Sequence, residues 1–421
     1  MKPRLLFLAH RIPYPPNKGD KLRSFSLLRH LSRAFSVSLG AFVDDADDWG
    51  HGAALEDWCA ERFLQPLHPW LGKIKSAKGL ITQEALTLPY YRHRAMQRWV
   101  DRKVEEDGIQ HILVYSSAMA QYVVHHLPRM SRAVIDFVDV DSEKWRDYAC
   151  HRPWPWSWLY RREARQLLHF DREVAARFDA GVFVSAAERE LFATRAPEVA
   201  GRLTHIPNGV DVSHFSPGRA YENPYRQEGP VLVFTGAMDY WPNVDAVRWF
   251  AREVFPLVQS QLPDARFAIV GARPTNAVAA LDALPGVHVV GAVPDIRPYL
   301  AHAHAAVAPL RVARGVQNKV LEAMAMAKPV VATPAAMAGI EHAECFRGVT
   351  REQSGPFADC VVQILRNGDP DGLGEAGRAL MTERYTWQRG LRQFEQLLGA
   401  PARPADKGAG QLGAHPVANT A

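Results

Sequence analysis

The chain has 421 residues, too many for one ordinary hydrophobic core, so we expect about two domains. Its hydrophobic content of 47% and charged content of 23% are typical of a soluble globular protein, and a net charge of +5 is too small to indicate a nucleic-acid partner. The four cysteines lie scattered without metal-ligand spacing, and no stretch approaches the roughly 18 apolar residues of a membrane span. These features argue against a disulfide framework, a zinc site and a transmembrane protein, and they predict a cytoplasmic one.

Short apolar runs that predict strands alternate with helical segments along almost the whole chain. In the first half the expected strands are residues 5–9, 37–42, 112–115, 133–140, 181–184 and 204–206. In the second half they are residues 231–234, 267–270, 287–290, 305–309 and 330–333. The expected helices between them include residues 22–32, 243–261 and 318–327. Because the strands are continuously apolar rather than alternating, they predict parallel sheets covered by helices on both faces, the doubly wound α/β fold.

A polar segment rich in proline and glycine, residues 216–230, separates two halves that are each of domain size. This composition is typical of a linker, so we expect one domain at 1–215 and a second at 216–380. From residue 399 the sequence loses its periodicity, which predicts a disordered tail over 399–421. Doubly wound sheets bind ligands at the carboxyl ends of their strands, so the functional residues are expected in loops there, facing a cleft between the domains.

Two such loops in the first domain carry candidate residues. Gly19 precedes an amphipathic helix, in a loop stiffened by three prolines, and its missing side chain lets backbone approach a ligand; a plain connecting loop is the alternative. Asp139 lies in an acidic segment that ends a strand, where a carboxylate suits base or metal chemistry. The alternative is that this segment only caps the next helix. The 17 histidines show no HExxH motif and no paired spacing, so no metal is expected.

Three strand ends in the second domain carry glycines, namely Gly236, Gly271 and Gly291. Gly236 follows the first strand and would leave space for phosphates, while Arg273 adds a cation after the next strand. Val293 follows the third strand, where a base ring can lie against the backbone. A tight strand-to-helix turn is the alternative for each glycine. The dinucleotide fingerprint G-x-G-x-x-G is absent at every strand end, which argues against hydride transfer.

The most informative segment, residues 311–333, reads as strand end, glycine turn, helix and strand. A helix N-terminus already carries partial positive charge, so Arg311, Arg314 and Lys319 beside it are unfavourable there unless an anion, most simply a phosphate, binds. Glu322 stands one helical turn after Lys319 and can accept hydrogen bonds from a polyol such as ribose.

Two stretches combine basic residues with tryptophan and tyrosine. Residues 71–103 hold eight Lys or Arg against two acidic residues, and residues 151–165 add Trp154, Trp156 and Trp158 beside several arginines. This combination favours a peripheral contact with anionic lipid on the cytoplasmic face of the inner membrane. Solvated helix faces with buried aromatic rings are the alternative.

Over nearly its whole length the chain resembles the retaining glycosyltransferases of family 4, which have the GT-B fold of two Rossmann-like domains. The resemblance rests on the Gly19 loop and on residues 206–211, 231–236 and 314–333. Residues 136–145, 238–243 and 315–329 are most similar to the sugar transferases associated with exosortase and exopolysaccharide loci.

The resemblance implies a nucleotide-diphosphate sugar held by the second domain and a membrane-associated, lipid-linked or polysaccharide acceptor held by the first. It also implies a last helix, residues 381–398, that crosses back to the first domain. The mechanism that the resemblance implies transfers the sugar with retention, with cations at the leaving diphosphate supplying most of the catalysis and with no metal or cofactor.

The same resemblance implies the roles of single residues. Glu322 matches the second acid of the family's E-x7-E motif, which binds the ribose. The amides of Gly315 and Val316 would meet the diphosphate, as would the side chains of Arg273, Lys319 and Arg314. Gly19 would lie close to the donor from the opposite domain.

There are also departures from the family pattern. The first acid of E-x7-E should stand where the chain has Arg314, so the donor sugar cannot be carried over. The family's Arg–Lys pair has no counterpart after Gly236, and its first-domain histidine has none either; Asp139 or Asp141 is the candidate in that neighbourhood. Two other functions therefore stay open: a non-catalytic nucleotide-sugar-binding scaffold of a polysaccharide assembly complex, and a GT-B sugar-nucleotide epimerase or phosphorylase.

Overall fold

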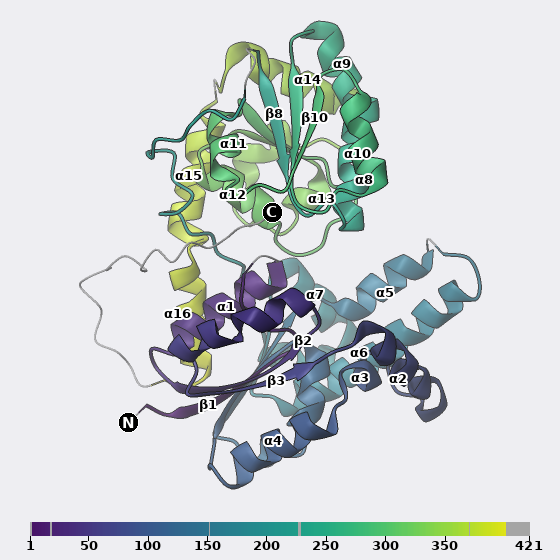
Figure 1. Cartoon of the computed structure of the whole chain (residues 1–421), viewed down its shortest axis with the longest axis vertical. Helices are drawn as coiled ribbons and strands as arrows, with labels where there is room; N and C mark the ends of the chain where they lie inside the picture. The colour runs from purple at the N-terminus through teal and green to yellow at the C-terminus, as the bar shows by residue number, and fades with distance from the viewer. Residues whose placement is uncertain (1, 17–18, 151, 226–228, 370, 401–421) are drawn as a thin grey trace. The chain divides into compact units, whose positions relative to one another are not determined.

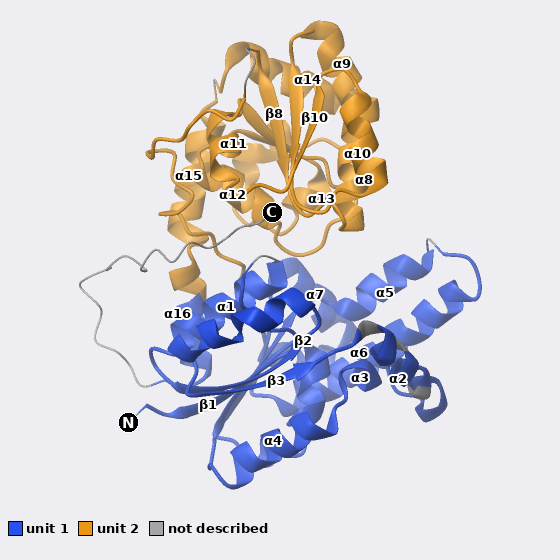
Figure 2. Ribbon diagram, in the orientation of Figure 1, with its two compact units in different colours: residues 1–206, 391–415 blue, residues 207–390, 416–421 orange. Residues whose placement is uncertain are grey.

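The computed structural model describes residues 2–16, 19–150, 152–225, 229–369 and 371–400 (Figure 1). The described residues form two compact units, residues 2–206 with 391–400 and residues 207–390 (Figure 2). The units divide at Ile206, whereas the sequence placed the boundary at residue 215. Most of the predicted tail, residues 401–421, lies outside the described part of the chain.

Within its described residues, unit 1 contains a seven-stranded parallel sheet in the order β3-β2-β1-β4-β5-β6-β7. Its strands are β1 Arg4–Ala9, β2 Ser36–Val43, β3 Glu61–Pro66, β4 His111–Tyr115, β5 Arg132–Val138, β6 Ala180–Phe183 and β7 Leu203–His205. Its helices are α1 Gly19–Leu31, η1 Ala46–Asp57, α2 Pro69–Thr82, α3 Thr87–Tyr91, α4 Arg94–Glu105, η2 Ser117–Tyr122, η3 Leu127–Arg129, α5 Asp141–Cys150, α6 Trp156–Arg177, α7 Ala186–Arg195 and η4 Pro197–Arg202.

Within its described residues, unit 2 contains a five-stranded parallel sheet in the order β10-β9-β8-β11-β12. Its strands are β8 Val231–Thr235, β9 Arg266–Val270, β10 Val287–Gly291, β11 Ala305–Ala308 and β12 Val330–Ala332. Its helices are α8 Trp241–Trp249, η5 Phe250–Val254, α9 Phe255–Gln261, α10 Asn276–Ala279, η6 Ala280–Ala283, α11 Arg297–His302, α12 Asn318–Ala325, α13 Pro334–Met337, η7 Glu344–Val349, α14 Ser354–Asn367 and α15 Leu373–Arg384.

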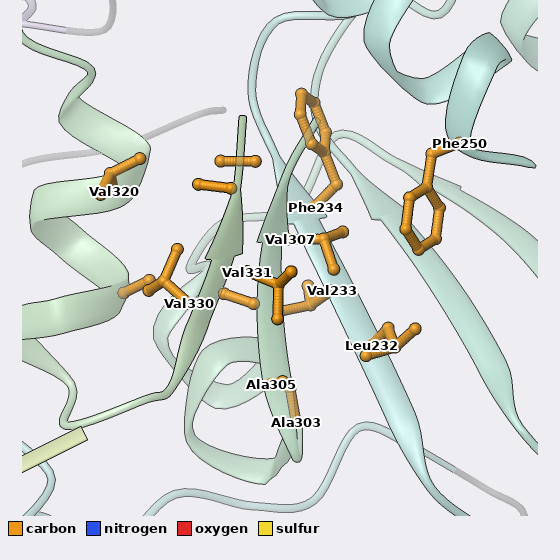
Figure 3. Packing of buried hydrophobic residues seen from close by; sticks show 14 of the residues in the cluster. Leu232, Val233, Phe234, Phe250, Ala303, Ala305, Val307, Val320, Val330 and Val331 are labelled. Carbon is orange, nitrogen blue, oxygen red and sulfur yellow. The ribbon is translucent and has the colours of Figure 1, made fainter. Parts of the chain in front are cut away.

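The core of unit 2 shows why the strands are continuously apolar. Leu232, Val233 and Phe234 are consecutive residues of β8 and each is at most 1% exposed (Figure 3). Since neighbouring side chains of a strand point to opposite faces, both faces of this sheet are covered. Phe250 of η5 and Val320 of α12 belong to the same buried cluster (Figure 3). The predicted doubly wound α/β fold is confirmed in both units.

Two elements differ from the sequence prediction. The strand β3 was not expected, because this edge strand (ERFLQP) is only half-buried and lacks a continuous apolar run. The single helix predicted over 243–261 is interrupted by the wider turn η5 between α8 and α9. Pro256, the second residue of α9, has no N–H to donate to the preceding turn, which explains why the regular helical ladder is broken there.

The last helix, α16 Trp387–Leu397, begins in unit 2 and ends in unit 1. Within unit 1, Arg23 of α1 lies 5.4 Å from the centre of the Phe394 ring, and His30 Nε2 lies 3.2 Å from a carboxylate oxygen of Glu395. His111 Nδ1 and the carbonyl oxygen of Leu398 are 3.0 Å apart. Residues 391–400 therefore pack as part of unit 1.

Candidate functional site

The candidate site of unit 2 lies at the carboxyl edge of its sheet. The strands β8 and β11 are neighbours, but the chain leaves β8 towards β9 on one side and leaves β11 towards β12 on the other. In open α/β sheets, ligands bind at such a switch point, outside the carboxyl ends of the strands. The loops that meet there begin at Gly236 and at Pro309, and the second of them leads into α12.

Lys319, in the first turn of α12, is half-buried against the end of β8. Its Nζ donates a 2.5 Å hydrogen bond to Oδ1 of Asn243 and lies 4.5 Å from the centre of the Phe234 ring. Burial lowers the pKa of Lys319 from 10.5 to about 7, because the surroundings stabilise the ammonium ion less than water does. Glu322 raises this pKa but does not offset the effect of burial, so an anionic ligand would stabilise the ammonium ion further.

Gly236 and Gly271 allow these loops to pack closely. A Cβ on Gly271 would lie 1.7 Å from the carbonyl oxygen of Gly236, and a Cβ on Gly236 would lie 3.2 Å from Nζ of Lys319. The N–H of Gly236 donates to the carbonyl of Val270 at 3.0 Å. This N–H therefore continues the sheet ladder instead of facing a phosphate, and Gly236 contributes room for the lysine.

The N-terminus of α12 has no side-chain cap. Gln317 stands at the N-cap position without a capping hydrogen bond, and its amide instead donates to the carbonyl of Arg314 at 2.8 Å. Gly315 has φ of +63°, which favours glycine. Its carbonyl oxygen packs closely on Gly339, since a Cβ on Gly339 would lie 2.4 Å from that oxygen. No acceptor among the described residues is bonded to the N–H of Gly315 or of Val316. Such a helix end is suited to binding an anion.

Glu322 follows one turn later on α12 and is also half-buried. Burial raises its pKa from 4.5 to about 8, although the nearby Lys319 acts in the opposite direction. Within the described part of the chain, no hydrogen bond reaches its carboxyl group. The two side chains are therefore both shifted towards their neutral forms and retain hydrogen-bonding capacity for a ligand.

Two of the cations singled out in the sequence are already paired with carboxylates. Arg311 makes a bidentate ion pair with Asp245 of α8, with N–O distances of 2.6 and 3.0 Å. Arg273, half-exposed after β9, pairs with Asp239 at 2.5 Å. The side chain of Arg314 is half-buried. Arg311 thus belongs to the contact between the loop and α8, while the donor roles of Arg273 and Arg314 stay predictions.

Val293 lies in the hydrophobic core of unit 2 and is 7% exposed. Its side chain packs inward, so only its backbone remains for the predicted contact with a base. The neighbouring Asp295 is committed to a bidentate ion pair with Arg297, with a closest N–O distance of 2.7 Å.

The predicted residues of unit 1 lie at separate strand ends. Gly19 is exposed and begins α1. Asp139 follows β5, where Val138 has φ of +69°, and its carboxylate pairs with Lys144 at 2.9 Å. Lys144 also pairs with Asp141 at 2.8 Å, and these carboxylates hold the pKa of Lys144 well above its ordinary value despite burial. The proposed catalytic role of Asp139 stays a prediction, and its carboxylate is already engaged.

Sequence reasoning missed two charged clusters at the same edge of unit 1. Arg23 and Asp136 form a buried ion pair at 2.7 Å, and Arg23 also donates to the carbonyl of Ile206. Arg11 lies 2.6 Å from Asp20 and 2.7 Å from Asp44. Burial acts against ionisation of Asp20, yet hydrogen bonding and the charges of His10 and Arg11 lower its pKa. Burial prevails at Asp136 and raises its pKa even beside Arg23.

The two aromatic and basic stretches are only partly exposed. Trp99 is 4% exposed, and the buried Lys103 pairs with Glu61 and Asp107. Arg162 is also buried, and donates to the carbonyl of Gly79 at 2.6 Å. The side chains of Lys73 and Lys78 lie outside the described part. None of the described helices combines the length and apolar character that crossing a membrane requires.

Residues 229–367 match the family model described as Glycosyl transferases group 1. The match runs from just before β8 to the end of α14, and so includes the whole unit 2 sheet and α12. A comparison with curated proteins found no match.

Solved structures match over almost the whole chain. Sucrose-phosphate synthase from Thermosynechococcus elongatus aligns with 94% of this chain and 98% of its own, at 15% identity and a TM-score of 0.67. HepE from Anabaena, in complex with UDP and glucose, aligns with 94% of this chain and 100% of its own, at 16% identity and a TM-score of 0.64. WaaG, a glycosyltransferase involved in lipopolysaccharide biosynthesis, gives the same coverages at 14% identity and a TM-score of 0.62. These likenesses identify the GT-B fold, and with the family match they support a sugar transferase.

Proposed function

We propose that the protein is a retaining glycosyltransferase that moves a sugar from a nucleotide-diphosphate donor to a membrane-associated or polysaccharide acceptor in exopolysaccharide biosynthesis, at the cytoplasmic face of the inner membrane. One observation carries the donor part of the proposal. The uncapped N-terminus of α12 brings unbonded N–H groups, a lysine with a lowered pKa and an unbonded carboxyl group into two consecutive helical turns.

A nucleoside diphosphate sugar matches each of these groups chemically. The diphosphate accepts hydrogen bonds from the N–H groups of Gly315 and Val316 and keeps Lys319 protonated, while Glu322 accepts hydrogen bonds from ribose hydroxyls. HepE, which shares the fold, has been crystallised with UDP and with UDP-glucose, so uridine nucleotides are the first donors to test.

The same groups would promote transfer. In the proposed step the bond between the anomeric carbon and the diphosphate oxygen breaks, and a bond to the acceptor oxygen forms on the same face. The acceptor hydroxyl loses its proton to an oxygen of the departing diphosphate. Lys319 and the helix N-terminus stabilise the negative charge that develops on this leaving group. No metal or cofactor takes part in this step.

Exposed aromatic and aliphatic side chains of unit 1 support the membrane part of the proposal. Trp154 is 79% exposed just before α6, and Trp156 and Trp158 on α6 are 54% and 51% exposed. On α2, Trp70 and Ile81 are 63% and 86% exposed. Arg162 links these elements, since it donates to α2 from α6. Exposed tryptophans with nearby arginines suit the interface of an anionic bilayer.

A second function, a nucleotide-sugar-binding scaffold without catalysis, is favoured by Arg314. A cation stands here at the position of the acid that contacts the donor sugar in the family's motif. In this case nucleotide binding would be retained and sugar transfer absent.

The test of the donor is a panel of nucleotides followed by radiolabelled nucleotide sugars, with and without membranes. We expect one nucleoside diphosphate to raise the melting temperature, and its sugar conjugate to label a membrane-extractable product. Binding without turnover would support the scaffold, isomerised donor would support the epimerase, and stabilisation by no nucleotide would contradict the donor site itself.

The membrane contact is tested by co-sedimentation with vesicles that contain phosphatidylglycerol. Replacing Trp154, Trp156 and Trp158 by serine should reduce binding to anionic vesicles, while Trp49→Ser serves as the control because Trp49 is also exposed, at 44%. Equal sedimentation of both variants and the wild type would contradict this docking surface.

A further inference from the structure

Three metal-ligating side chains meet on unit 1, outside the residues that we assign to sugar transfer. Asp101 comes from α4, and His125 and His126 lie between η2 and η3. The Nε2 atoms of His126 and His125 lie 2.8 and 3.3 Å from one and the same carboxylate oxygen, Oδ1 of Asp101. All three ligand atoms lie within 4.8 Å of one another.

Hydrogen bonding alone leaves this oxygen crowded. Oδ1 of Asp101 also accepts a 2.8 Å hydrogen bond from the amide of Gln97, so three donors would converge on it. A carboxylate has about four lone-pair sites over its two oxygens, hence about two on each. A cation between the imidazoles and the carboxylate removes the conflict, since both rings then present Nε2 lone pairs to it and carry their protons on Nδ1.

The separations suit a transition metal. Zinc binds histidine nitrogens and carboxylate oxygens at about 2.0–2.2 Å, usually in a tetrahedron, which places neighbouring ligand atoms about 3.3 Å apart. The separation of His125 Nε2 from Oδ1, 3.3 Å, equals this spacing, whereas that of His126 Nε2, 2.8 Å, is shorter, so His126 and Asp101 would move slightly apart when a metal binds. Two imidazoles with one carboxylate favour zinc and its first-row neighbours over magnesium or calcium, which prefer oxygen ligands alone.

The ligands are held in place by their surroundings. His126 is 3% exposed, and its backbone N–H donates to the carbonyl of Val123 at 2.8 Å. The amide of Gln97 bonds both to Asp101 and to the carbonyl of Tyr122, which fixes the carboxylate. His125 has a side chain that is 54% exposed, so solvent has access to the site. The hydrogen bond from Gln97 to Asp101 is an outer contact of the kind that orients a metal ligand.

We propose that Asp101, His125 and His126 form a binding site for a divalent first-row transition metal such as Zn²⁺, with water completing the coordination. The metal links α4 to the segment after η2 and stabilises unit 1. The ligands come from positions 24 and 25 residues apart, which is why the spacing of histidines in the sequence did not reveal them.

The test uses the full chain after removal of metal with a chelator. Calorimetric titration with Zn²⁺ should show one equivalent that is absent from His125→Asn and from Asp101→Asn, and this equivalent should raise the melting temperature of the wild type only. Co²⁺ should give the visible absorption of a site with nitrogen and oxygen ligands. His125 is exposed, so its replacement is expected to leave the fold intact.

The matched control is His169→Asn. His169 Nε2 lies 3.5 Å from a carboxylate oxygen of Glu173, in an exposed pair on α6. This variant should bind Zn²⁺ as the wild type does. Equal Zn²⁺ binding by the wild type and by both site variants, or no stoichiometric binding by the wild type, would overturn the proposal.

Discussion

The carboxyl edges of the two sheets both gather charged side chains, but they neutralise them differently. In unit 1, Asp20 lies against Arg11 with a lowered pKa, and Lys144 lies against two carboxylates with a raised one. Each is stabilised in its charged form by a partner in the protein. In unit 2, Lys319 and Glu322 are shifted the other way, by burial, towards their neutral forms. At Asp20 and Lys144 of the first edge the protein's own partners outweigh burial, whereas at Lys319 and Glu322 burial prevails, so the second edge is suited to receive a charged ligand.

The largest effect is expected from breaking a completed pair. Asp136→Ala leaves the buried Arg23 without its carboxylate, which should lower the free energy of unfolding by about 3–5 kcal/mol. Urea denaturation measures the change. The double variant Arg23→Met/Asp136→Leu should recover much of the loss, because neither charge then remains buried. A loss below about 1 kcal/mol in Asp136→Ala would show that the pair is not structural.

The next effect is expected on activity rather than on stability. Lys319→Met and Glu322→Ala should each lower kcat/KM for sugar transfer by about 10²–10³-fold, since each removes a group that faces the proposed donor. Because burial disfavours the charged forms of Lys319 and Glu322, removing either group should leave the free energy of unfolding unchanged or raise it. Lys144→Met is the comparison in unit 1, and it should lower stability because Asp139 and Asp141 lose their partner. Full transfer activity in both unit 2 variants would contradict the donor site.

A third difference should appear in the dependence of stability on pH. Glu322 has a pKa of about 8 when folded and 4.5 as its ordinary value, so its contribution to stability is present at pH 4.5 and is lost as the pH rises towards 8. Lys319, with a lowered pKa of about 7, contributes stability that is present above pH 10.5 and is lost as the pH falls to 7. Relative to the wild type, Glu322→Gln should therefore gain stability as the pH rises from about 5 to 8.

Denaturation at pH 5, 6.5 and 8 measures this gain, and the exposed Glu375→Gln of α15 is the control that should show none. The same pH profile for both variants would show that the Glu322 carboxyl group is not perturbed in the folded state.

The smallest effect is expected at the exposed pair of unit 2. Asp239→Ala should change the unfolding free energy by less than about 1 kcal/mol, because exposed ion pairs contribute little. It also removes the carboxylate that pairs with the Arg273 guanidinium, so the affinity for the nucleoside diphosphate should stay equal or rise a few-fold. Nucleotide titration of the variant measures this, and a marked loss of affinity would show that Asp239 itself supports the donor site.

Most of the fold could be predicted because its signal is local. Continuous apolar strands such as β8 are buried on both faces wherever they lie in a parallel sheet. The edge strand β3 was not predicted, because its pairing with β2 in the sheet, rather than its amino-acid composition, makes it a strand. The break between α8 and α9 had a local signal in Pro256, which was not used.

The candidate site was predicted in part. Lys319 and Glu322 lie on one helix, and the spacing along that helix already places them one turn apart. Their environment was not predictable, because Asn243 is 76 residues away from Lys319 in the sequence. The two residues come together only because the first turns of α8 and α12 pack against each other beside Gly236. The signal in the sequence was a polar residue, Asn243, in the first turn of α8.

By itself the sequence determined the doubly wound architecture and the helix of unit 2 whose N-terminus is surrounded by cations, since periodicity and helix polarity depend on neighbouring residues. Only the tertiary structure decided which of those cations are already compensated. Arg311 pairs with Asp245 of α8, and Arg273, after β9, pairs with Asp239. Lys319 instead contacts the amide of Asn243 and the ring of Phe234. Charge compensation depends on distance and burial in three dimensions, and the order of residues along the chain does not contain either.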